Sequence, residues 1–453
     1  MAIERMLCTL GQGNQKVGEW EGLEWRFTDK QYTAWGGLRL VEEMLRRIGF
    51  KEALRRSGLP EPGSNRGCDP VEVMQAFVIS VWVGATRFAH TALLRFDRVL
   101  QEMFSLGAVP STSTFTRFFR RFRQPQVEEV FGYLSRWFWE QLQPATLTVD
   151  LDSTVLTRFG HQEGSVLGYN PLRRGKPCQH PLLAFAAELR MVVHAWMRPG
   201  NTRSGCNAEA FFREVQALLS GRHRIGLVRG DSGFSADSLL SLWEAEAINY
   251  IVSARMMPPV RRQLSGMTNW VEIEPGVSVS ELQYHALGWK EPRRLVVVRE
   301  QASPSKRGRW LLEVPGYSYC VYLTNLTLPP MEIKRLYDAR ADSENRIKEL
   351  GEDFGLSGFV SQKFWATEAA LRAVILAYNL MALFRQAVLK TAHYQMLATL
   401  RVQCFAIGAS LGRKGHKRIL RLGLSPPRRA WFEGLFASSK QFALPLHPKT
   451  YNA

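Results

Sequence analysis

The segment LTVDLDSTVL at residues 147–156 combines the alternation of a half-buried β-strand with two acidic side chains. Side chains along a strand point alternately to its two faces, so Asp150 and Asp152 share one face while the leucines and valines share the other. An unpaired carboxylate is costly to bury. The acidic face therefore needs a basic side chain, hydrogen-bond donors or a metal ion opposite it.

The charge balance indicates a polyanionic partner. The chain has 453 residues, enough for two or three domains, and its hydrophobic content of 45% excludes a mainly disordered protein. Lys and Arg number 59 against 41 Asp and Glu, which gives a net charge of +18 and a pI near 9.9. Nucleic acid is the partner that this excess favours, and a solvated basic surface is the alternative.

Cysteine usage and hydropathy indicate the cytoplasm. The six cysteines form no CxxC pair, so neither a zinc site nor a disulfide framework is expected. The first twenty residues do not resemble a signal peptide. The most apolar stretch, AVILAYNLMALF at 373–384, is too short to span a bilayer and predicts a buried helix. We therefore expect no membrane association.

The hydrophobic pattern changes several times along the chain. It is helical at first, then alternates between strands and helices, then becomes strand-rich, and finally returns to helix before a basic end. The predicted divisions are a helical DNA-binding region (1–141), the first part of an α/β core (142–255), a β-rich insertion (256–326), the remainder of the core (327–390) and a basic C-terminal region (391–453).

A predicted helix from about Met331 to Leu350 carries a polar stripe. At 100° per residue, Tyr337, Arg340, Glu344 and Lys348 fall within about 80° of one another. Taken alone, such a stripe is typical of an exposed helix face with ion pairs four residues apart.

Three acidic candidates occupy three different elements. Asp152 or Asp150 lies on the first strand, Asp231 ends a later strand in RIGLVRGDSGF, and Glu344 lies on the late helix. Side chains at the carboxyl ends of strands in an α/β sheet can converge. Two Mg²⁺ ions need several carboxylate ligands, and such pairs of ions catalyse phosphoryl transfer on nucleic acids.

The acidic segments resemble the motifs of a known family. DLDST at 150–154, RGDSGF at 229–234 and YDARADSENRIKEL at 337–350 are similar to the three acidic motifs of DDE-type transposases of bacterial insertion sequences. The resemblance is greatest to the insertion sequence 1380 group within the insertion sequence 4 superfamily, and it extends over most of the chain from about Gly36.

The late motif of that superfamily is Tyr, two residues, Arg, three residues, Glu, six residues, Lys. Tyr337, Arg340 and Glu344 match its first three members, whereas Gly351 stands where the lysine is expected. Lys348 lies on the same predicted stripe and is a candidate for a related role.

The resemblance implies an α/β fold with a ribonuclease-H-like catalytic core, a β-rich insertion, and helical N-terminal and C-terminal regions. It implies that Asp152, Asp231 and Glu344 hold two Mg²⁺ ions, with Mn²⁺ as a substitute, and that Tyr337 and Arg340 bind a DNA phosphate. Lys348 joins this DNA-binding set as a candidate. Asp150 is either a supporting neighbour of the site or the actual first ligand.

The same resemblance implies the reaction. A transposase of this kind cleaves DNA at the terminal inverted repeats of its element and joins the 3′ ends to target DNA. Its partners would be double-stranded transposon ends and target, bound by a homodimer in a synaptic complex in the bacterial cytoplasm, at the nucleoid. The alternatives are a ribonuclease-H-like nuclease or resolvase without strand transfer, and a catalytically inactive DNA-binding descendant.

Basic and aromatic segments supply further DNA-contact candidates. Four basic runs could contact the DNA backbone, at 171–176, 293–299, 305–309 and 412–421. Trp289 and Trp310 could stack on an unpaired base, although core packing is the favoured explanation for each of them.

Overall fold

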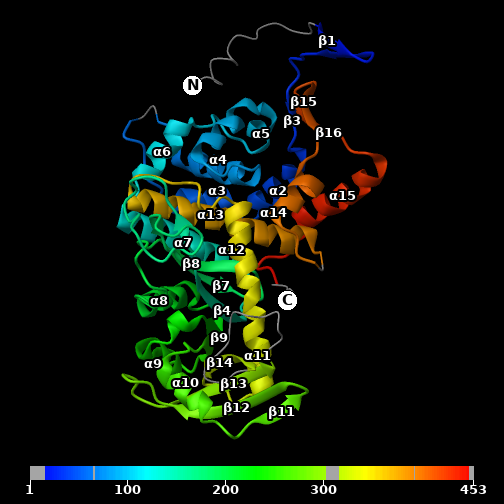
Figure 1. The fold of residues 1–453 in the computed structure, drawn as a ribbon. Helices are drawn as coiled ribbons and strands as arrows, with labels where there is room; N and C mark the ends of the chain where they lie inside the picture. The colour runs from blue at the N-terminus through cyan, green and yellow to red at the C-terminus, as the bar shows by residue number, and fades with distance from the viewer. Residues whose placement is uncertain (1–15, 65–66, 302–315, 392, 448–453) are drawn as a thin grey trace.

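The computed structural model describes residues 16–64, 67–301, 316–391 and 393–447. Within these ranges, a mixed sheet of nine strands runs in the order β11-β12-β13-β14-β10-β9-β4-β7-β8, and helices pack around it (Figure 1). The predicted α/β class is confirmed. The strands are Thr146–Ser153 (β4), Leu182–Ala186 (β7), Met191–Trp196 (β8), Arg224–Gly230 (β9), Asn249–Ser253 (β10), Val271–Glu274 (β11), Val277–Tyr284 (β12), Arg293–Gln301 (β13) and Tyr317–Thr324 (β14).

The strand predicted from LTVDLDSTVL is β4, and its neighbours run in opposite senses. β4 pairs antiparallel with β7 and parallel with β9, and β9 pairs parallel with β10. Helix α8 (Ala208–Leu219) precedes β9, and α9 (Asp237–Ala245) connects β9 to β10. Because β4 and β9 are parallel and adjacent, the residues that follow the two strands come together at one edge of the sheet.

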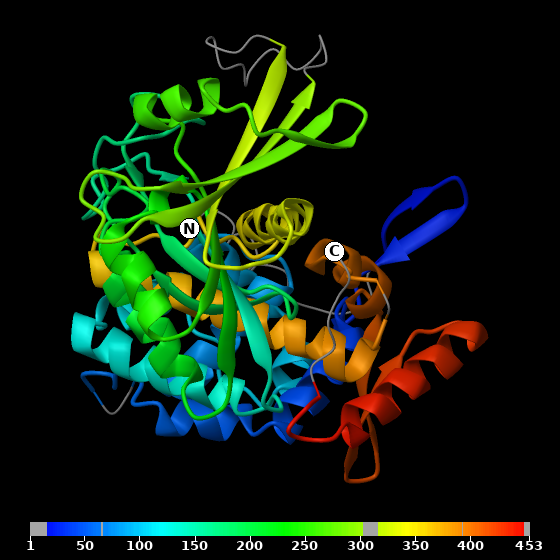
Figure 2. The same ribbon diagram turned by 90° about the horizontal axis from the view of Figure 1, so that it is seen from below.

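The strand-rich stretch after β10 extends the same sheet. β14 pairs antiparallel with β10, and β13, β12 and β11 continue outward as an antiparallel meander. Seen from below, these strands project beyond the helical part of the molecule (Figure 2). The first predicted strand of this stretch, from Trp270 onward, is a hairpin of β11 and β12, which is preceded by α10 (Pro258–Ser265).

The N-terminal part is largely helical, as its periodicity predicts, after three short strands. Side chains cap two of the helices: the Asp69 carboxylate accepts a hydrogen bond from Val71 N, and the Ser111 hydroxyl accepts one from Thr114 N. The elements are β1 (Lys16–Trp20), β2 (Leu23–Arg26), β3 (Tyr32–Thr33), η1 (Gly36–Leu38), α2 (Arg39–Arg47), α3 (Phe50–Arg56), α4 (Pro70–Trp82), η2 (Phe88–Phe96), α5 (Arg98–Met103), α6 (Thr112–Arg120) and α7 (Gln124–Trp139).

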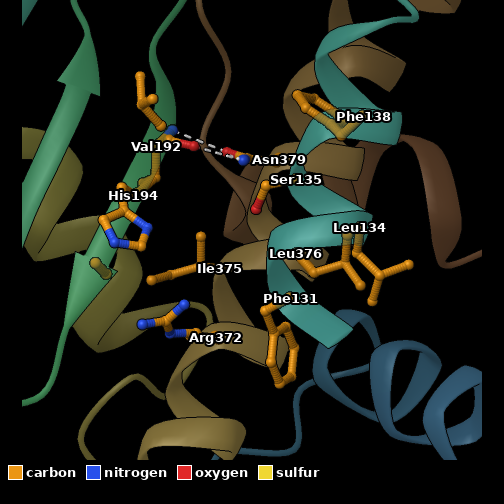
Figure 3. A pocket seen from close by; sticks show the side chains of 12 residues that line it. Phe131, Leu134, Ser135, Phe138, Val192, His194, Arg372, Ile375, Leu376 and Asn379 are labelled. Atoms are coloured by element: carbon orange, nitrogen blue, oxygen red, sulfur yellow. Dashed lines mark hydrogen bonds between the residues drawn. The ribbon is translucent and has the colours of Figure 1, made fainter. Parts of the chain in front are cut away.

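Helix α13 (Phe364–Phe384) joins these helices to the sheet. It packs against α4, α6, α7 and β8, and the π-helical turn η5 (Arg385–Leu389) continues it. The Asn379 amide donates to Val192 O at 2.7 Å and accepts from Val192 N at 2.9 Å, so it replaces a missing strand neighbour at the edge strand β8 (Figure 3).

The buried helix predicted from the apolar stretch is confirmed, but it is longer than that stretch. The segment Phe364–Leu389 has 26 residues and is long and apolar enough to cross a membrane by length and composition. Its most apolar window is wholly buried inside the protein. A core helix of a large domain has these properties as well, and the packing of α13 on both sides is that of a core helix.

The predicted helix from Met331 to Leu350 is divided in two. Helix α11 (Pro330–Asp338) is followed by a 3₁₀ turn, η4 (Ala339–Ala341), and by α12 (Asp342–Glu352). Gly351 lies inside the last turn of α12, so the helix continues two residues beyond its predicted end at Leu350. The chain reverses at Gly355, whose φ of 69° lies in the left-handed region that glycine adopts without strain.

The C-terminal region was predicted to be helical, and it contains a β-hairpin as well. Strands β15 (Ala409–Lys414) and β16 (Lys417–Leu422) pair with each other, and β15 also pairs with β3. The remaining elements are β5 (Leu156–Thr157), β6 (Cys178–Gln179), η3 (Ser232–Phe234), α14 (Leu397–Leu400), the π-helical turn η6 (Arg401–Phe405) and α15 (Pro426–Gln441).

Candidate active site

Asp150 is fully buried on β4, beneath α11 and α12. Its carboxylate accepts hydrogen bonds from Arg229 of β9, with Nε at 2.6 Å and Nη2 at 3.0 Å. Nη1 of Arg346 on α12 lies 3.8 Å from Oδ2. Burial raises the pKa of Asp150, and these arginines oppose the rise. The basic partners that the acidic strand face requires are therefore supplied by the fold itself.

Asp152 lies two residues further on, where β4 ends, and is 9% exposed. Its Oδ1 accepts a hydrogen bond from Ser153 N at 2.8 Å. Its Oδ2 accepts one from the Ser343 hydroxyl of α12 at 3.1 Å and lies 3.1 Å from Nη2 of Arg340. Asp152 therefore shares its partners with the late helical segment.

Asp231 stands beside Asp152. The register pairs Asp150 with Arg229 and Leu151 with Gly230, so Asp152 and Asp231 leave the two parallel strands together. Burial raises the pKa of Asp152; Arg340 opposes this rise, and the neighbouring Asp231 carboxylate adds to it. Two carboxylates in such proximity favour a cation near both of them.

The RGDSGF segment positions Asp231 through a local turn. The Asp231 carboxylate accepts a hydrogen bond from Gly233 N at 2.8 Å and caps the short helix η3. Gly233 packs so closely against Ser204 that an added Cβ would lie 2.7 Å from the serine Cβ. The glycine is therefore required by close packing.

Arg340 is buried between the sheet and α12. Its Nη2 also lies 3.4 Å from Leu151 O, and its Nε is buried without a hydrogen-bond partner in the described part of the chain. Burial alone would lower the pKa of Arg340, but Asp152 and the other nearby acidic groups raise it above its ordinary value. Arg340 is therefore charged, neutralises Asp152 and retains one buried donor for a further acceptor.

A cavity of about 530 Å³ opens beside Arg340. Tyr337, Arg340 and Glu344 lie on one wall. The other walls come from β10, β14 and the segment that follows β10, with Ser253, Met256, Arg261, Tyr319, Cys320 and Tyr322 among the lining residues.

Tyr337 packs within this wall. Its ring centroid lies 4.9 Å from that of Tyr322, and burial raises its pKa. The first three members of the late motif therefore face one cavity, as the helical stripe predicted.

The structure does not bring all three predicted acids together. Asp152 and Asp231 are neighbours, whereas Glu344 is exposed at the start of α12. In the part of the chain that the structure describes, no three His, Cys, Asp or Glu side chains are close enough to share a metal ion. Lys348 is exposed and is not part of the cavity wall.

The 3₁₀ turn explains the position of Glu344. A 3₁₀ turn advances by about 120° per residue and an α-helix by about 100°, so three residues of η4 rotate α12 by about 60° relative to a continuous helix. Ser343 and Arg346 point toward β4 as a result, and Glu344 lies at the cavity rim.

Sequence reasoning missed the residues that hold the site together. Arg229, Ser343 and Arg346 contact Asp150 or Asp152 and were not among the predicted site residues. A signal for Arg229 existed, because it is two residues before Asp231 and so shares a strand face with it. Arg346 also pairs with Asp342 one turn earlier, with Nη2 2.5 Å from Oδ2.

Side chains of the predicted DNA-contact run at 293–299 make contacts within the protein. Arg293 pairs with Asp237 and Glu244, each at 2.7 Å. The guanidinium of Arg299 lies 4.0 Å from the Trp270 ring centroid. The prediction that residues 293–299 contact the DNA backbone is therefore wrong for Arg293, whose buried guanidinium is already bound by two carboxylates, and it stays a prediction for the rest of the run.

Of the two tryptophans predicted as candidates for base stacking, the structure describes only Trp289. Trp289 packs against Tyr284 and lies under Arg293, with the guanidinium 5.1 Å from its ring centroid, so core packing explains it. Trp310 and the basic run at 305–309 lie outside the described residues.

Comparison with known proteins identifies the class. The model of the family described as "Transposase DDE domain group 1" matches residues 16–443. The chain therefore belongs to this family of DDE transposases. No curated protein matches the chain.

Nine chains of solved structures match the fold. One is the cryo-EM structure of the piggyBac transposase synaptic complex with hairpin DNA, which has a TM-score of 0.44 at 12% identity. The alignment covers 81% of this chain and 78% of that chain.

DDE transposases normally use divalent metal ions, and part of the site fits such an ion. Asp152 and Asp231 offer hard oxygen ligands side by side, which is the donor chemistry that Mg²⁺ and Mn²⁺ prefer. Glu344 faces the same cavity and could complete the set only with a change in its position relative to the two aspartates.

Proposed function

We propose that this protein is an active DNA transposase that cleaves at the terminal inverted repeats of an insertion sequence and joins the 3′ ends to target DNA. The observation that carries the proposal is the Asp152–Asp231 pair at the ends of two parallel strands, next to a cavity that Tyr337, Arg340 and Glu344 line. The resemblance of its sequence motifs supports our proposal that it belongs to the insertion sequence 1380 group.

The arrangement of the acids supports a ribonuclease-H-like catalytic core. That plan has its first two acids on adjacent strands and its glutamate on a helix, and Asp152, Asp231 and Glu344 have these positions. We divide the chain accordingly into a DNA-binding region (1–141), a core (142–255 and 327–390) with an insertion (256–326), and a basic C-terminal region (391–453).

The proposed metal ligands are Asp152, Asp231 and Glu344. Two Mg²⁺ ions, or Mn²⁺ as a substitute, would when bound activate water or a 3′-hydroxyl and stabilise the leaving oxygen. Asp150 is the less suitable first ligand because Arg229 already occupies both of its oxygens. Its role is to hold the ends of β4 and β9 in register.

Arg340 and Tyr337 bind the DNA phosphate in this proposal. The guanidinium has a buried Nε without a partner, and its planar fork suits a phosphate. A phosphate in the cavity would compete with Asp152 for Arg340 and would free the Asp152 carboxylate. Lys348, exposed one turn beyond Glu344, would contact the DNA backbone outside the cavity.

The reaction implies further partners. Two transposon ends must be inserted together, so we propose a homodimer that holds both ends in a synaptic complex with target DNA. Its place of action would be the bacterial cytoplasm, at the nucleoid. A nuclease without strand transfer and an inactive DNA-binding descendant remain the competing functions.

One assay separates these functions. The purified protein is incubated with labelled inverted-repeat duplex, unlabelled target DNA and Mg²⁺, and the products are resolved by length. Cleavage followed by joined product is expected. Cleavage alone would identify a nuclease, and a mobility shift without cleavage would identify a DNA-binding protein.

Glu344→Gln tests the catalytic assignment, with Glu352→Gln as the control. Both glutamates are exposed on α12, but only Glu344 faces the cavity. We expect Glu344→Gln to lose cleavage while it keeps its fold and DNA binding, and Glu352→Gln to cut at the wild-type rate. Full cleavage by Glu344→Gln would show that the assignment is wrong.

A further inference from the structure

The hairpin of β15 and β16 carries a concentration of positive charge that the catalytic site does not use. Its segment 409–422 contains Arg413, Lys414, Lys417, Arg418 and Arg421 and no acidic residue. The hairpin stands at one end of the molecule, beside β3 and away from the nine-stranded sheet (Figure 1).

The two faces of the hairpin differ in chemistry. Ala409, Leu411, Leu420 and Leu422 share the inner face, and Leu411 and Leu420 line a cavity with residues of α2 and α5. The outer face carries Lys414, Lys417 and Arg421, all exposed, and Ser410 on this face pairs with exposed Tyr32 of β3. The apolar inner face fixes the hairpin to the body and leaves the basic face outward.

The cations of the hairpin oppose one another across the strands. The register places Arg413 opposite Arg418 and Lys414 opposite Lys417. Like charges directly opposite each other destabilise a hairpin. Arg418 pairs with Glu102 of α5, but none of the other four cations forms an ion pair in the described part of the chain. A polyanion on the outer face would relieve this repulsion.

Glycines shape the outer face. Gly415, at φ 59°, begins the two-residue turn between the strands, as expected for a tight hairpin. The guanidinium of Arg421 lies so close over Gly412 that a Cβ there would overlap it. Because Gly412 has no side chain, the Arg421 guanidinium can lie flat on the outer face of the hairpin.

We propose that the outer face of the β15–β16 hairpin binds the phosphate backbone of duplex DNA through Lys414, Lys417 and Arg421. The inference rests on the proposed function, to which it adds a specific DNA-contact element. The major groove of B-DNA admits a two-stranded β-ribbon, and backbone contacts of this kind fix the position of a protein on DNA. Ile419 is the one large apolar side chain on this face of the hairpin, and a membrane-binding surface would need more of them.

The test measures the salt dependence of DNA binding. The triple variant Lys414→Gln, Lys417→Gln and Arg421→Gln is compared with wild type by fluorescence anisotropy on a labelled duplex over a series of KCl concentrations. Each lost phosphate contact lowers the slope of log K against log salt by about 0.9, so we expect a slope that is smaller by about 2 to 3. The loss of DNA affinity should be the same for any duplex sequence, because phosphate contacts do not depend on the bases.

The matched control removes three cations elsewhere. Arg213 pairs with Glu209 and Lys363 pairs with Glu163, and Arg224 is exposed at the start of β9, at the opposite end of that strand from Asp231. The variant Arg213→Gln, Arg224→Gln and Lys363→Gln has the same net charge as the hairpin variant. We expect it to keep a slope within about 1 of wild type.

Lys417→Glu distinguishes a DNA contact from a structural role. It places a carboxylate opposite Lys414, so the hairpin should be at least as stable as in wild type while DNA affinity falls. We therefore expect the unfolding temperature to rise or stay the same while the DNA affinity falls. A loss of both together would contradict the proposal.

The outcomes separate this inference from the proposed function. A wild-type protein that binds DNA with a steep salt slope but does not cut would overturn the transposase proposal and leave the hairpin assignment standing. A triple variant with the wild-type slope would overturn the hairpin assignment whether or not the protein cuts. Loss of binding to vesicles of anionic phospholipid, with an unchanged DNA slope, would also overturn it.

Discussion

Two groups of ionisable side chains lie against the same sheet and differ in how completely their partners are supplied. The α13–β8 charge network consists of His194, Glu214, Glu368 and Arg372. The acidic cluster consists of Asp152 and Asp231. A cavity of about 530 Å³, lined by Arg340 and Glu344, adjoins it. The network is closed by its own partners, whereas the cluster depends on Arg340.

In the α13–β8 charge network, the protein supplies a partner for each charge. Glu368, 1% exposed, accepts hydrogen bonds from Arg372 Nε at 2.6 Å and from Met197 N at 2.5 Å. His194 Nε2 lies 2.7 Å from the Glu214 carboxylate, which also accepts from Trp196. His194 and Arg372 lie among apolar side chains of α7, β8 and α13 (Figure 3).

In the acidic cluster, the protein does not supply a partner for every polar group. Asp152 and Asp231 are adjacent like charges, Arg340 faces Asp152 with an unpartnered Nε, and Glu344 is exposed. The contrast indicates that ionisable groups whose partners the fold supplies maintain the fold, whereas incompletely partnered charges near a cavity are available for ligands. Three experiments test this contrast.

The largest expected effect is on stability, from Glu368→Gln. The neutral amide leaves the Arg372 cation buried without its carboxylate and turns a donor toward Met197 N or Arg372. We expect a loss of about 3–5 kcal/mol in the free energy of unfolding, measured by denaturant titration. Asp231→Asn is the comparison and should change stability by less than about 1 kcal/mol. Equal losses in the two variants would remove the distinction between the groups.

The second effect is a pH dependence that comes from His194. Burial lowers its pKa to about 4, while Glu214 opposes the shift and Arg372 adds to it, and Phe211 and Trp196 pack against the ring. Below about pH 6.5 the unfolded chain binds a proton that the folded protein does not bind until about pH 4. Stability due to this group is therefore complete above that range and falls as the pH is lowered through it.

His194→Gln isolates this contribution. We expect wild type to lose up to about 1.4 kcal/mol per pH unit more than the variant between pH 6.5 and 4, measured by denaturant titration at each pH. The exposed His161→Gln should follow wild type. Identical pH profiles for wild type and His194→Gln would mean that His194 is not held neutral by the network.

The smallest expected effect concerns Arg340→Gln and Mg²⁺. Without the guanidinium, Asp152 and Asp231 face each other with no adjacent cation, so Mg²⁺ should bind the variant more tightly. We expect saturating Mg²⁺ to stabilise the variant by about 1 kcal/mol more than wild type, read as a shift in unfolding temperature. Asp231→Asn added to Arg340→Gln should abolish the extra shift. If Mg²⁺ shifts the unfolding temperature of Arg340→Gln no more than that of wild type, Arg340 does not weaken Mg²⁺ binding at the two aspartates.

Much of the local structure could be predicted because its causes are local. The cap of Asp69 before Pro70, the alternation of β4 and the apolar length of α13 depend on residues close in sequence. The resemblance of the short acidic motifs to DDE transposases likewise required only their order, and the family match along residues 16–443 agrees with it.

The partners of the acids could not be predicted from local patterns. Arg229 is 79 residues from Asp150, and Ser343 is 191 residues from Asp152. The interruption of the late helix by η4, which moves Glu344 to the cavity rim, depends on how α12 packs on the sheet. For the same reason, the basic run of β13 alone does not reveal that acidic side chains of α9 bind Arg293.

The sequence by itself determined that two aspartates share one strand face, that a third acid follows a later strand and a fourth lies on a late helix, because side-chain periodicity follows from backbone geometry. Only the tertiary structure decided that Arg229 occupies both oxygens of Asp150, and that Asp152 lies beside Asp231 and contacts Arg340 at the wall of a cavity. That arrangement depends on the register of β4 with β9 and on the phase of α12, and both are set by packing between segments far apart in the chain.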